Sequence, residues 1–416
     1  MQERGSTWSC MLGTRGGACR GAVGHSGRRL GTGSFADYHT HSKTPPQSGM
    51  RQAVKLRSFT SGFTRAFGHL GQALRAHMSR LKVAIIGCGA VTQMFHLPAL
   101  AANDRVELTA LVDQSGERAA RLAEQVHAKL VTSDYREAMD EAEAAIVAVP
   151  NHLHASVSLE LMRQRLHVLV EKPMALGHSD CEAMIETARS QGVVLAVGLV
   201  RRFTPAAAFV KSALERNLLG QISRFDFREG APYGWQVTSD APFRVDTGGG
   251  LLADIGVHVL DLLLWWLGDF ESVKYADDAL GGVEAECEIE LTFRNGARGT
   301  VELSRTRSLR NTYILEGERG SLEVGIGANP SVTLHLSDHS SSLTGQVGAG
   351  MGASDRKMKD LFILQLEDFV TAVFQRKAPF VQGHDGARVI AAIDACRSVR
   401  RPLRFPWVFP TGALTT

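Results

Sequence analysis

The sequence LKVAIIGCGAVT, residues 81–92, indicates how the first half of the chain folds. Its first six residues are almost all apolar, which is typical of a central strand in a parallel sheet that is covered on both faces. The strand ends at a G-x-G motif, Gly87 and Gly89, where the first glycine allows a tight turn and the second lets the backbone approach a pyrophosphate. The phosphate charge would then lie at the N-terminus of the following helix. Thr92 replaces the glycine or alanine that usually ends this motif.

A second strand, VELTALVD, ends at Asp113, roughly twenty residues beyond the glycine motif. A carboxylate at this position can accept hydrogen bonds from both ribose hydroxyls of NAD and would repel the 2′-phosphate of NADP. Gln114 and Ser115 follow, with no Arg immediately after Asp113, so we expect NAD as the cofactor rather than NADP. The alternative role of Asp113 is to cap the next helix.

Strand and helix patterns alternate up to about residue 200. We expect helices at 115–126, 135–140, 152–165 and 179–191, and strands at 129–132, 144–150, 167–173 and 193–198. This alternation predicts an α/β fold with a doubly wound, Rossmann-type parallel sheet, which binds ligands at the carboxyl ends of its strands. The candidate cofactor-binding residues are Gly87, Gly89, Ala90, Val91, Asp113, Pro150, Asn151, His154, Glu171 and Lys172.

The triplet EKP places a cation at the same edge of the sheet. Lys172 ends a buried strand, between Glu171 and Pro173. Its ammonium could donate to a substrate oxygen and stabilise an alkoxide as it forms. The alternative is a salt bridge at the strand end. The sequence leaves open whether the Lys172–Pro173 bond is cis.

The stretch GGGLLADIGVHVLDLLLWWLG, residues 248–268, predicts a helix that is buried on most sides. Asp254, His258 and Asp261 interrupt its apolar sequence at i, i+4 and i+7, on one face of the helix. Burying an unpaired charge is costly, so these side chains must face each other or a polar cavity. One interpretation is an Asp/His pair that fixes the helix in place, and we assign Asp261 to structure or cofactor support rather than to catalysis.

Several segments together resemble one known family. They are GCGAVTQMFHLPAL, AVPNHLHA, EKPMAL, VGLVRRF and the 248–268 stretch, in this order. In this combination, residues 81–402 resemble the Gfo/Idh/MocA family of NAD(P)-dependent oxidoreductases. The resemblance implies a C-terminal α/β domain with a large, mostly antiparallel sheet that often makes oligomer contacts. It also implies that Lys172, Asp254 and His258 lie at the site of hydride transfer.

The second half of the chain carries its own strand signals. Apolar and polar residues alternate over 286–293, an Asn295–Gly296 turn follows, and a returning strand and a further hairpin extend to about residue 326. The Ser- and Gly-rich residues 328–355 predict a surface excursion. Helices at about 357–375 and 387–399 are expected to close this domain. The predicted domains are an extension over 1–80, a dinucleotide-binding domain over 81–200 and a substrate-binding and oligomerisation domain over 201–405.

The first 80 residues differ in composition from the rest. Twelve Lys or Arg residues stand against two Asp or Glu residues there, although the chain of 416 residues carries a formal net charge of only +3. The extension is rich in Gly, Ser and Arg and predicts disorder. Residues 51–80 resemble an organelle transit peptide. The favoured alternative is an upstream extension with a true start at Met50 or Met78, and no aromatic interleaving supports nucleic-acid binding.

The remaining composition favours a soluble intracellular protein. The six cysteines form no C-x-x-C motif and no cluster at metal-ligand spacing, so we expect no metal. The longest apolar run, at 262–267, is far shorter than the roughly twenty residues that span a bilayer. We expect a cytoplasmic location, with organelle targeting as the less favoured alternative, and neither a membrane nor a nucleic-acid partner.

These observations predict an NAD-dependent oxidoreductase that transfers hydride between nicotinamide and a secondary alcohol or ketone. The resemblance to the family implies that this substrate is a sugar, polyol or related compound. His258 would exchange the hydroxyl proton, Asp254 would orient the ring or contact a neighbouring hydroxyl, and Lys172 would counter the alkoxide charge. Tyr233 and Trp235 offer aromatic faces to a sugar, and Arg202 could bind an anionic group, although each of the three could serve packing instead. We expect a homo-oligomer through the C-terminal sheet. The alternative function is a non-catalytic, NAD-binding ligand sensor.

Overall fold

The computed structural model describes residues 80–403, except for 235, 329, 338–341 and 347–356. All described residues belong to one compact unit that contains two β-sheets. The expectations for residues 1–79 and for Trp235 lie outside the described residues.

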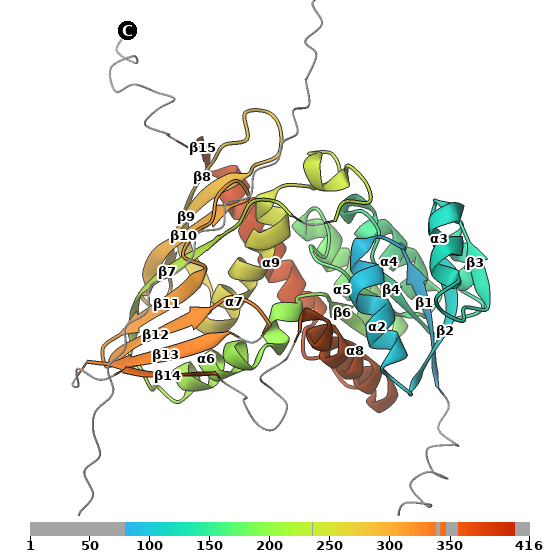
Figure 1. Ribbon diagram of the computed structural model, residues 1–416, viewed down its shortest axis with the longest axis horizontal. Helices are drawn as coiled ribbons and strands as arrows, with labels where there is room; N and C mark the ends of the chain where they lie inside the picture. Colours follow the sequence, from blue (N-terminus) through green and yellow to red (C-terminus); the bar gives the residue numbers. More distant parts are fainter. Residues whose placement is uncertain (1–79, 235, 329, 338–341, 347–356, 404–416) are drawn as a thin grey trace, which may run out of the picture. The chain divides into compact units, whose positions relative to one another are not determined.

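The first sheet has six parallel strands in the order β3-β2-β1-β4-β5-β6, with helices on both faces (Figure 1). The strands are β1 (Leu81–Ile86), β2 (Val106–Val112), β3 (Leu130–Thr132), β4 (Ala144–Val147), β5 (His167–Val170) and β6 (Leu195–Val197). The helices are α2 (Leu97–Ala101), α3 (Gly116–Ala123), α4 (His154–Arg163) and α5 (His178–Gln191). The predicted doubly wound parallel sheet is confirmed.

Strand β1 shows why these residues form a central strand. Val83 and Ile85 pack on one face with α2 and α3, whereas Ala84 and Ile86 pack on the other with α4 and α5. All four side chains are almost fully buried. A strand covered on both faces needs apolar residues at successive positions, and LKVAII supplies them.

The second sheet has nine strands in the order β14-β13-β12-β11-β7-β10-β9-β8-β15. They are β7 (Ile222–Gly230), β8 (Phe270–Asp277), β9 (Glu286–Phe293), β10 (Arg298–Ser304), β11 (Thr312–Gly317), β12 (Gly320–Gly325), β13 (Ser331–Leu336), β14 (Ser342–Gln346) and β15 (Arg400–Pro402). The pairs β7–β10 and β8–β15 are parallel and the other pairs are antiparallel. Helices α6 (Pro205–Glu215) and α7 (Val257–Leu267) lie on one side of this sheet (Figure 1). The mostly antiparallel second sheet is confirmed.

The prediction of a surface excursion over 328–355 is wrong where the structure describes this segment. Strands β13 and β14 extend the second sheet instead. Val332 pairs with Val324, and Leu334 pairs with Leu322. In SVTLHL, apolar residues alternate with polar ones in register with the neighbouring strand β12. This alternation makes the segment a strand despite the Ser- and Gly-rich composition on either side of it.

The prediction that both C-terminal helices close the second domain is also wrong. Helix α8 (Met358–Gln375) packs on the first sheet, where Leu361, Phe362 and Phe369 join the same apolar cluster as Val83 and Ile85. Helix α9 (Gly383–Ser398) contacts both α5 and α7. After β6 the chain crosses to the second sheet, so the first-sheet face beside β5 and β6 is left for α8 to cover.

None of the described helices is long and apolar enough to cross a membrane. The four cysteines in this part of the chain are free and buried: Cys88, Cys181, Cys287 and Cys396.

Candidate active site

A cavity of about 1030 Å³ lies at the carboxyl ends of β1, β2, β4 and β5 and extends to the segment that leads into α7. Most residues singled out from the sequence line it: Gly87, Gly89, Ala90, Val91, Asp113, Pro150, Asn151, His154, Glu171, Lys172, Tyr233, Asp254 and His258. The structure therefore brings the candidate cofactor-binding residues and the candidate catalytic residues to one cavity, from both halves of the chain.

The glycine loop after β1 needs glycine and also uses Thr92. Gly87 has a φ of +105°, and a Cβ placed on it would lie 2.3 Å from the carbonyl oxygen of Ala148. The buried Thr92 hydroxyl donates a 2.6 Å hydrogen bond to the carbonyl of Gly87. The threonine that departs from the usual motif therefore ties the loop to the helix that follows. Gly89 lies on the cavity wall, where an added Cβ would lie 3.5 Å from the Thr238 hydroxyl, and the bare backbone there fits a dinucleotide pyrophosphate.

Asp113 accepts hydrogen bonds from several groups at the end of β2. The amides of Cys88 and Ser115 each donate to it at 2.8 Å. The Arg118 guanidinium lies 3.2 Å from both carboxylate oxygens and also donates to the carbonyl of Thr238. The side chain of Ser115, rather than that of Asp113, caps α3. Arg118 lies five residues after Asp113, near the start of α3, and was not among the residues singled out from the sequence.

Two further residues at this edge bind protein groups. The buried Glu171 lies 2.8 Å from Nε2 of His96 and accepts from the amide of Lys172. Burial alone would raise the pKa of Glu171, but its contacts with His96 and Lys172 lower it. Both ring nitrogens of His154 lie within 2.9 Å of backbone carbonyls, those of Pro173 and Val149. His154 therefore connects the loops after β4 and β5. The Lys172–Pro173 peptide bond is cis.

Lys172, Asp254 and Arg305 form a charged cluster in the cavity. The Lys172 ammonium donates to the Asp254 carboxylate and to its backbone carbonyl, both at 2.9 Å. Arg305 pairs with the other carboxylate oxygen. Burial would raise the pKa of Asp254, but the two cations outweigh it and hold that pKa below its ordinary value. Asp254 is therefore an anion at neutral pH.

His258 lies deeper in the same cavity. It is 8% exposed, and its Nδ1 has no hydrogen-bond partner among the described residues. Burial lowers its pKa well below the usual value, and the positive charges of Arg201 and Lys172 lower it further. The ring is therefore neutral at neutral pH. Among the described residues, no hydrogen bond joins His258 to Asp254.

Glu284 holds the segment that leads into α7. The amides of Leu251 and Leu252 donate to the backbone and the carboxylate of Glu284, at 3.0 and 2.8 Å. Residues Leu252–Gly256 then form a π-helical turn before α7 begins at Val257. These bonds satisfy amides that a helix N-terminus leaves free, and they fix Asp254 in the first turn.

The expectation that Arg202 binds substrate is wrong. Arg202 is buried away from the cavity, where it pairs with Asp261 at 2.6 Å and with Asp385 at 2.9 Å. Its neighbour Arg201 lines the cavity instead and pairs with the buried Glu229 at 2.6 Å. The two arginines of VGLVRRF look equivalent in the sequence, but the short 3₁₀ turn at 200–203 directs them apart.

Tyr233 reaches the cavity from the segment after β7. Its ring contacts that of Phe243 edge to face, with centroids 5.1 Å apart. The Arg305 guanidinium lies 5.5 Å from the Tyr233 ring centroid. An aromatic face therefore adjoins the charged cluster.

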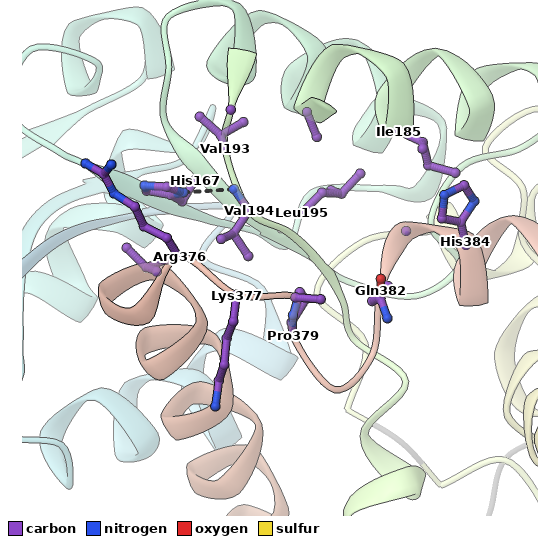
Figure 2. Close-up of a pocket in the computed structure, with 15 residues that line it drawn as sticks. His167, Ile185, Val193, Val194, Leu195, Arg376, Lys377, Pro379, Gln382 and His384 are labelled. Atoms are coloured by element: carbon purple, nitrogen blue, oxygen red, sulfur yellow. Dashed lines mark hydrogen bonds between the residues drawn. The ribbon is translucent and has the colours of Figure 1, made fainter. Parts of the chain in front are cut away.

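A second cavity, of about 530 Å³, lies where β5 and β6 begin, against α5 and the N-terminus of α9. Figure 2 shows that its cations, Arg376 and Lys377, point in different directions and that His384 stands apart from both. They do not converge on one ligand. Elsewhere too, the described residues contain no cluster of His, Cys, Asp and Glu that could hold a metal.

Two parts of the chain match known protein families. Residues 81–199 match the oxidoreductase family with an NAD-binding Rossmann fold. Residues 208–323 match the GFO/IDH/MocA C-terminal domain.

Individual relatives show the same similarity. The levoglucosan dehydrogenase of Pseudarthrobacter phenanthrenivorans is 29% identical over 291 residues, 59% of this chain and 73% of that protein. The structure of KijD10, a 3-ketoreductase from Actinomadura kijaniata in complex with NADP and TDP-benzene, has a TM-score of 0.68 at 24% identity, over 79% of this chain and 100% of that one. A levoglucosan dehydrogenase in complex with NADH and L-sorbose has a TM-score of 0.69 at 24% identity, over 77% and 97%. At these identities, the two structures show a shared fold.

The two family matches together cover more than half of the chain, and they coincide with the parallel sheet and with most of the second sheet. The glycine loop and Asp113 fit the dinucleotide that the first match describes. The chain therefore belongs to the Gfo/Idh/MocA family of oxidoreductases, with an NAD-binding Rossmann domain.

Proposed function

We propose that the protein is an NAD-dependent dehydrogenase or reductase that acts on a secondary alcohol or ketone of a sugar, polyol or related compound. One observation carries this proposal. Lys172, Asp254 and His258 line the same cavity as the glycine loop and Asp113, so a dinucleotide held by the loop would share the cavity with these three side chains.

The backbone of the glycine loop would bind the pyrophosphate, and Asp113 would accept from the adenosine ribose. The bound nicotinamide supplies the hydride chemistry. Lys172 donates one hydrogen bond to the carboxylate and one to the carbonyl of Asp254, and an ammonium has three N–H groups. Among the described residues no group accepts a hydrogen bond from the third N–H, which can therefore hold the substrate oxygen and stabilise negative charge on it.

His258 would be the proton acceptor in oxidation. Its ring is neutral, and its Nδ1 is buried, so Nε2 is the nitrogen that meets the substrate. The hydroxyl proton passes to Nε2, and the carbinol carbon loses its hydrogen together with the bonding electron pair, which leaves a carbonyl. In reduction, the protonated ring returns this proton to the substrate oxygen. Asp254 is held as an anion by two cations, so it orients Lys172 and does not act as the base.

We propose NAD as the preferred cofactor because Asp113 ends β2 as a carboxylate acceptor. Arg118 offsets part of its negative charge, which weakens the repulsion of a 2′-phosphate. The two similar structures differ in the same respect, since one contains NADP and the other NADH.

A sugar or polyol substrate is favoured by the aromatic face of Tyr233 beside the charged cluster, and by relatives named for sugar chemistry. We also propose that the protein forms a homo-oligomer through the second sheet. Helices α6, α7 and α9 lie on one side of this sheet (Figure 1). On β7 the more exposed Arg224, Asp226 and Arg228 alternate with Phe225 and Phe227, and Phe227 contacts Trp266 of α7, so the charged side chains point away from these helices.

The test follows NADH fluorescence over a panel of sugars and polyols. Turnover should appear with at least one compound, and Lys172→Ala and His258→Ala should each lower it by about 100-fold or more, with NADH affinity changed by less than about threefold. Lys377→Ala and His384→Ala are matched controls from the second cavity. NADH binding without oxidation or reduction of any compound would support the alternative, a non-catalytic sensor.

A further inference from the structure

We infer that Arg305 is a positioning residue of this active site: it holds the Asp254 carboxylate from the side opposite to Lys172, and so aims the Lys172 ammonium at the substrate oxygen. The inference rests on the proposed function, because it assigns Arg305 a part in the same reaction. Arg305 was not among the residues singled out from the sequence, where it simply follows a strand.

The backbone of Arg305 is fixed on both sides. Its amide donates to the carbonyl of Ala285 at 2.8 Å, and its carbonyl accepts from the amide of Tyr233 at 2.9 Å. Arg305 directly follows β10, so the nine-stranded sheet sets its position. The side chain is about a quarter exposed and lines the cavity.

The two cations divide the Asp254 carboxylate between them. Lys172 takes one oxygen and Arg305 takes the other. The Arg305 guanidinium is also held over the ring of Tyr233. Without Arg305, one oxygen of the Asp254 carboxylate would lose its partner. The carboxylate could then rotate about χ2, because this torsion of Asp adopts a broad range of angles. Lys172 would keep its bond to the backbone carbonyl of Asp254 but would lose the fixed carboxylate partner, and with one partner its ammonium would no longer hold a single direction toward the substrate.

Arg305 also contributes to the charge around His258. The charged groups that act on this ring are Arg201 after β6, Lys172 after β5, Asp254 before α7 and Arg305 after β10. The three cations lower the pKa of His258 and Asp254 raises it. Removing Arg305 should therefore raise the pKa of His258 and move the acid limb of the pH–rate profile to higher pH.

The experiment compares Arg305→Gln and Arg305→Lys with Arg307→Gln. Arg307 lies two residues further on, pairs with Glu286 and Glu302, and lies outside the cavity. Arg305→Gln should lower kcat by about 10- to 100-fold, with NADH affinity changed by less than about threefold. Arg305→Lys should recover part of the loss, and Arg307→Gln should leave kcat unchanged.

A double-mutant cycle tests whether Arg305 acts through Asp254. In an Asp254→Asn background, Arg305→Gln should cause little further loss of kcat, because the group it holds has already lost its charge. An equal loss in both backgrounds would overturn the inference. A loss of kcat in Arg307→Gln as large as that in Arg305→Gln would reduce Arg305 to one of several structural ion pairs, and would overturn it as well.

An NMR titration of His258 in the protein without added cofactor separates this inference from the proposed function. The ring signal should titrate at a higher pH in Arg305→Gln than in the wild type, and Arg307→Gln should match the wild type. If no substrate is turned over but the titration shifts, the proposed function fails and the placement of Arg305 beside the acid–base group stands. If the titration does not shift, the inference fails even in an active enzyme. Should Arg305→Gln fail to fold, Arg305→Lys in the same cycle and titration decides.

Discussion

At the residue scale, Asp113 illustrates how one side chain serves several partners. Its carboxylate accepts from two backbone amides and from Arg118, and it is only 8% exposed. A ribose at this position would meet a carboxylate that is fixed in direction and partly neutralised. The preference between the two dinucleotides therefore depends on Arg118 as well as on Asp113.

We predict that Arg118→Ala lowers the affinity for NADPH by about tenfold or more, and the affinity for NADH by less than about threefold. The reason is that Arg118 is the cation beside the carboxylate, where the 2′-phosphate of NADP would lie. Fluorescence titrations with each reduced dinucleotide measure both affinities without a substrate. Arg121→Ala, an exposed arginine on the same helix, is the control. Equal losses for the two dinucleotides would show that Arg118 only fixes Asp113.

Some site residues could be predicted from the sequence because they interrupt a pattern. Lys172 ends an apolar strand, and Asp254 and His258 are polar residues in an apolar helix. Arg118 and Arg305 gave no such signal, because an arginine on a helix or after a strand is usually a solvated charge. The role of Arg305 follows from its contact with Asp254, which is far away in the sequence. Arg118 lies only five residues after Asp113, and its contact depends on how the chain turns from β2 into α3, which apolar periodicity does not encode.

At the element scale, the helix over 248–268 shows what periodicity predicts and what it misses. The predicted helix is present, and it is buried on most sides. The regular spacing placed Asp254, His258 and Asp261 on one face, yet Asp261 pairs with Arg202 away from the cavity. Asp261 lies about one turn further along α7 than His258, where the helix meets Arg202 instead of the cavity, and periodicity does not indicate which partner each turn of a helix meets.

Strands β5 and β6 are joined by a histidine whose charge state matters for stability. Nδ1 of His167 accepts a 2.9 Å hydrogen bond from the amide of Val194, and burial lowers the pKa of His167 below 6.5. An unfolded chain would protonate this ring near its ordinary pKa of about 6.5. The stability that the neutral ring contributes is therefore present above that pKa and is lost as the pH falls below it.

We predict that the melting temperature falls between about pH 7.5 and about pH 5.5, and that His167→Gln reduces this fall. One such histidine contributes up to about 1.4 kcal/mol per pH unit. The pKa values of His154 and His258 are also lowered by burial, so part of the pH dependence should remain in the variant. Calorimetry at several pH values measures the effect, with the exposed His384→Gln as the control. An unchanged pH dependence in His167→Gln would contradict the assignment.

At the scale of the whole molecule, alternating strand and helix patterns predicted the first sheet, and hairpin signals predicted much of the second. The return of α8 to the first sheet could not be predicted. An amphipathic sequence specifies that a helix has an apolar face, but it does not specify which surface receives that face. For the same reason the sequence did not predict β13 and β14, because their pairing depends on a strand that the rest of the fold places beside them.

The charged residues on the outer face of the second sheet predict that an oligomer formed through this face is sensitive to salt. On β7, Phe225 and Phe227 point into the core, whereas Arg224, Asp226 and Arg228 are at least partly exposed. An interface built on such charges should weaken as salt screens them. We predict that light scattering finds a smaller average mass at high salt, and that Arg228→Glu has the same effect at low salt. Arg189→Glu on α5 should not change the mass, and a mass indifferent to salt and to Arg228→Glu would place the contact elsewhere.

Helix α8 covers the first sheet although strands β7 to β14 of the second sheet separate it from that sheet in the sequence. During translation, the ribosome releases the strands of the dinucleotide-binding half long before it releases Leu361 and Phe369. Until then, the nascent sheet keeps part of one apolar face open beside β5 and β6. The nucleotide-binding half therefore completes its core only after the strands from β7 to β14 have been made, and a stop codon shortly before residue 358 would leave it with an uncovered surface that favours aggregation.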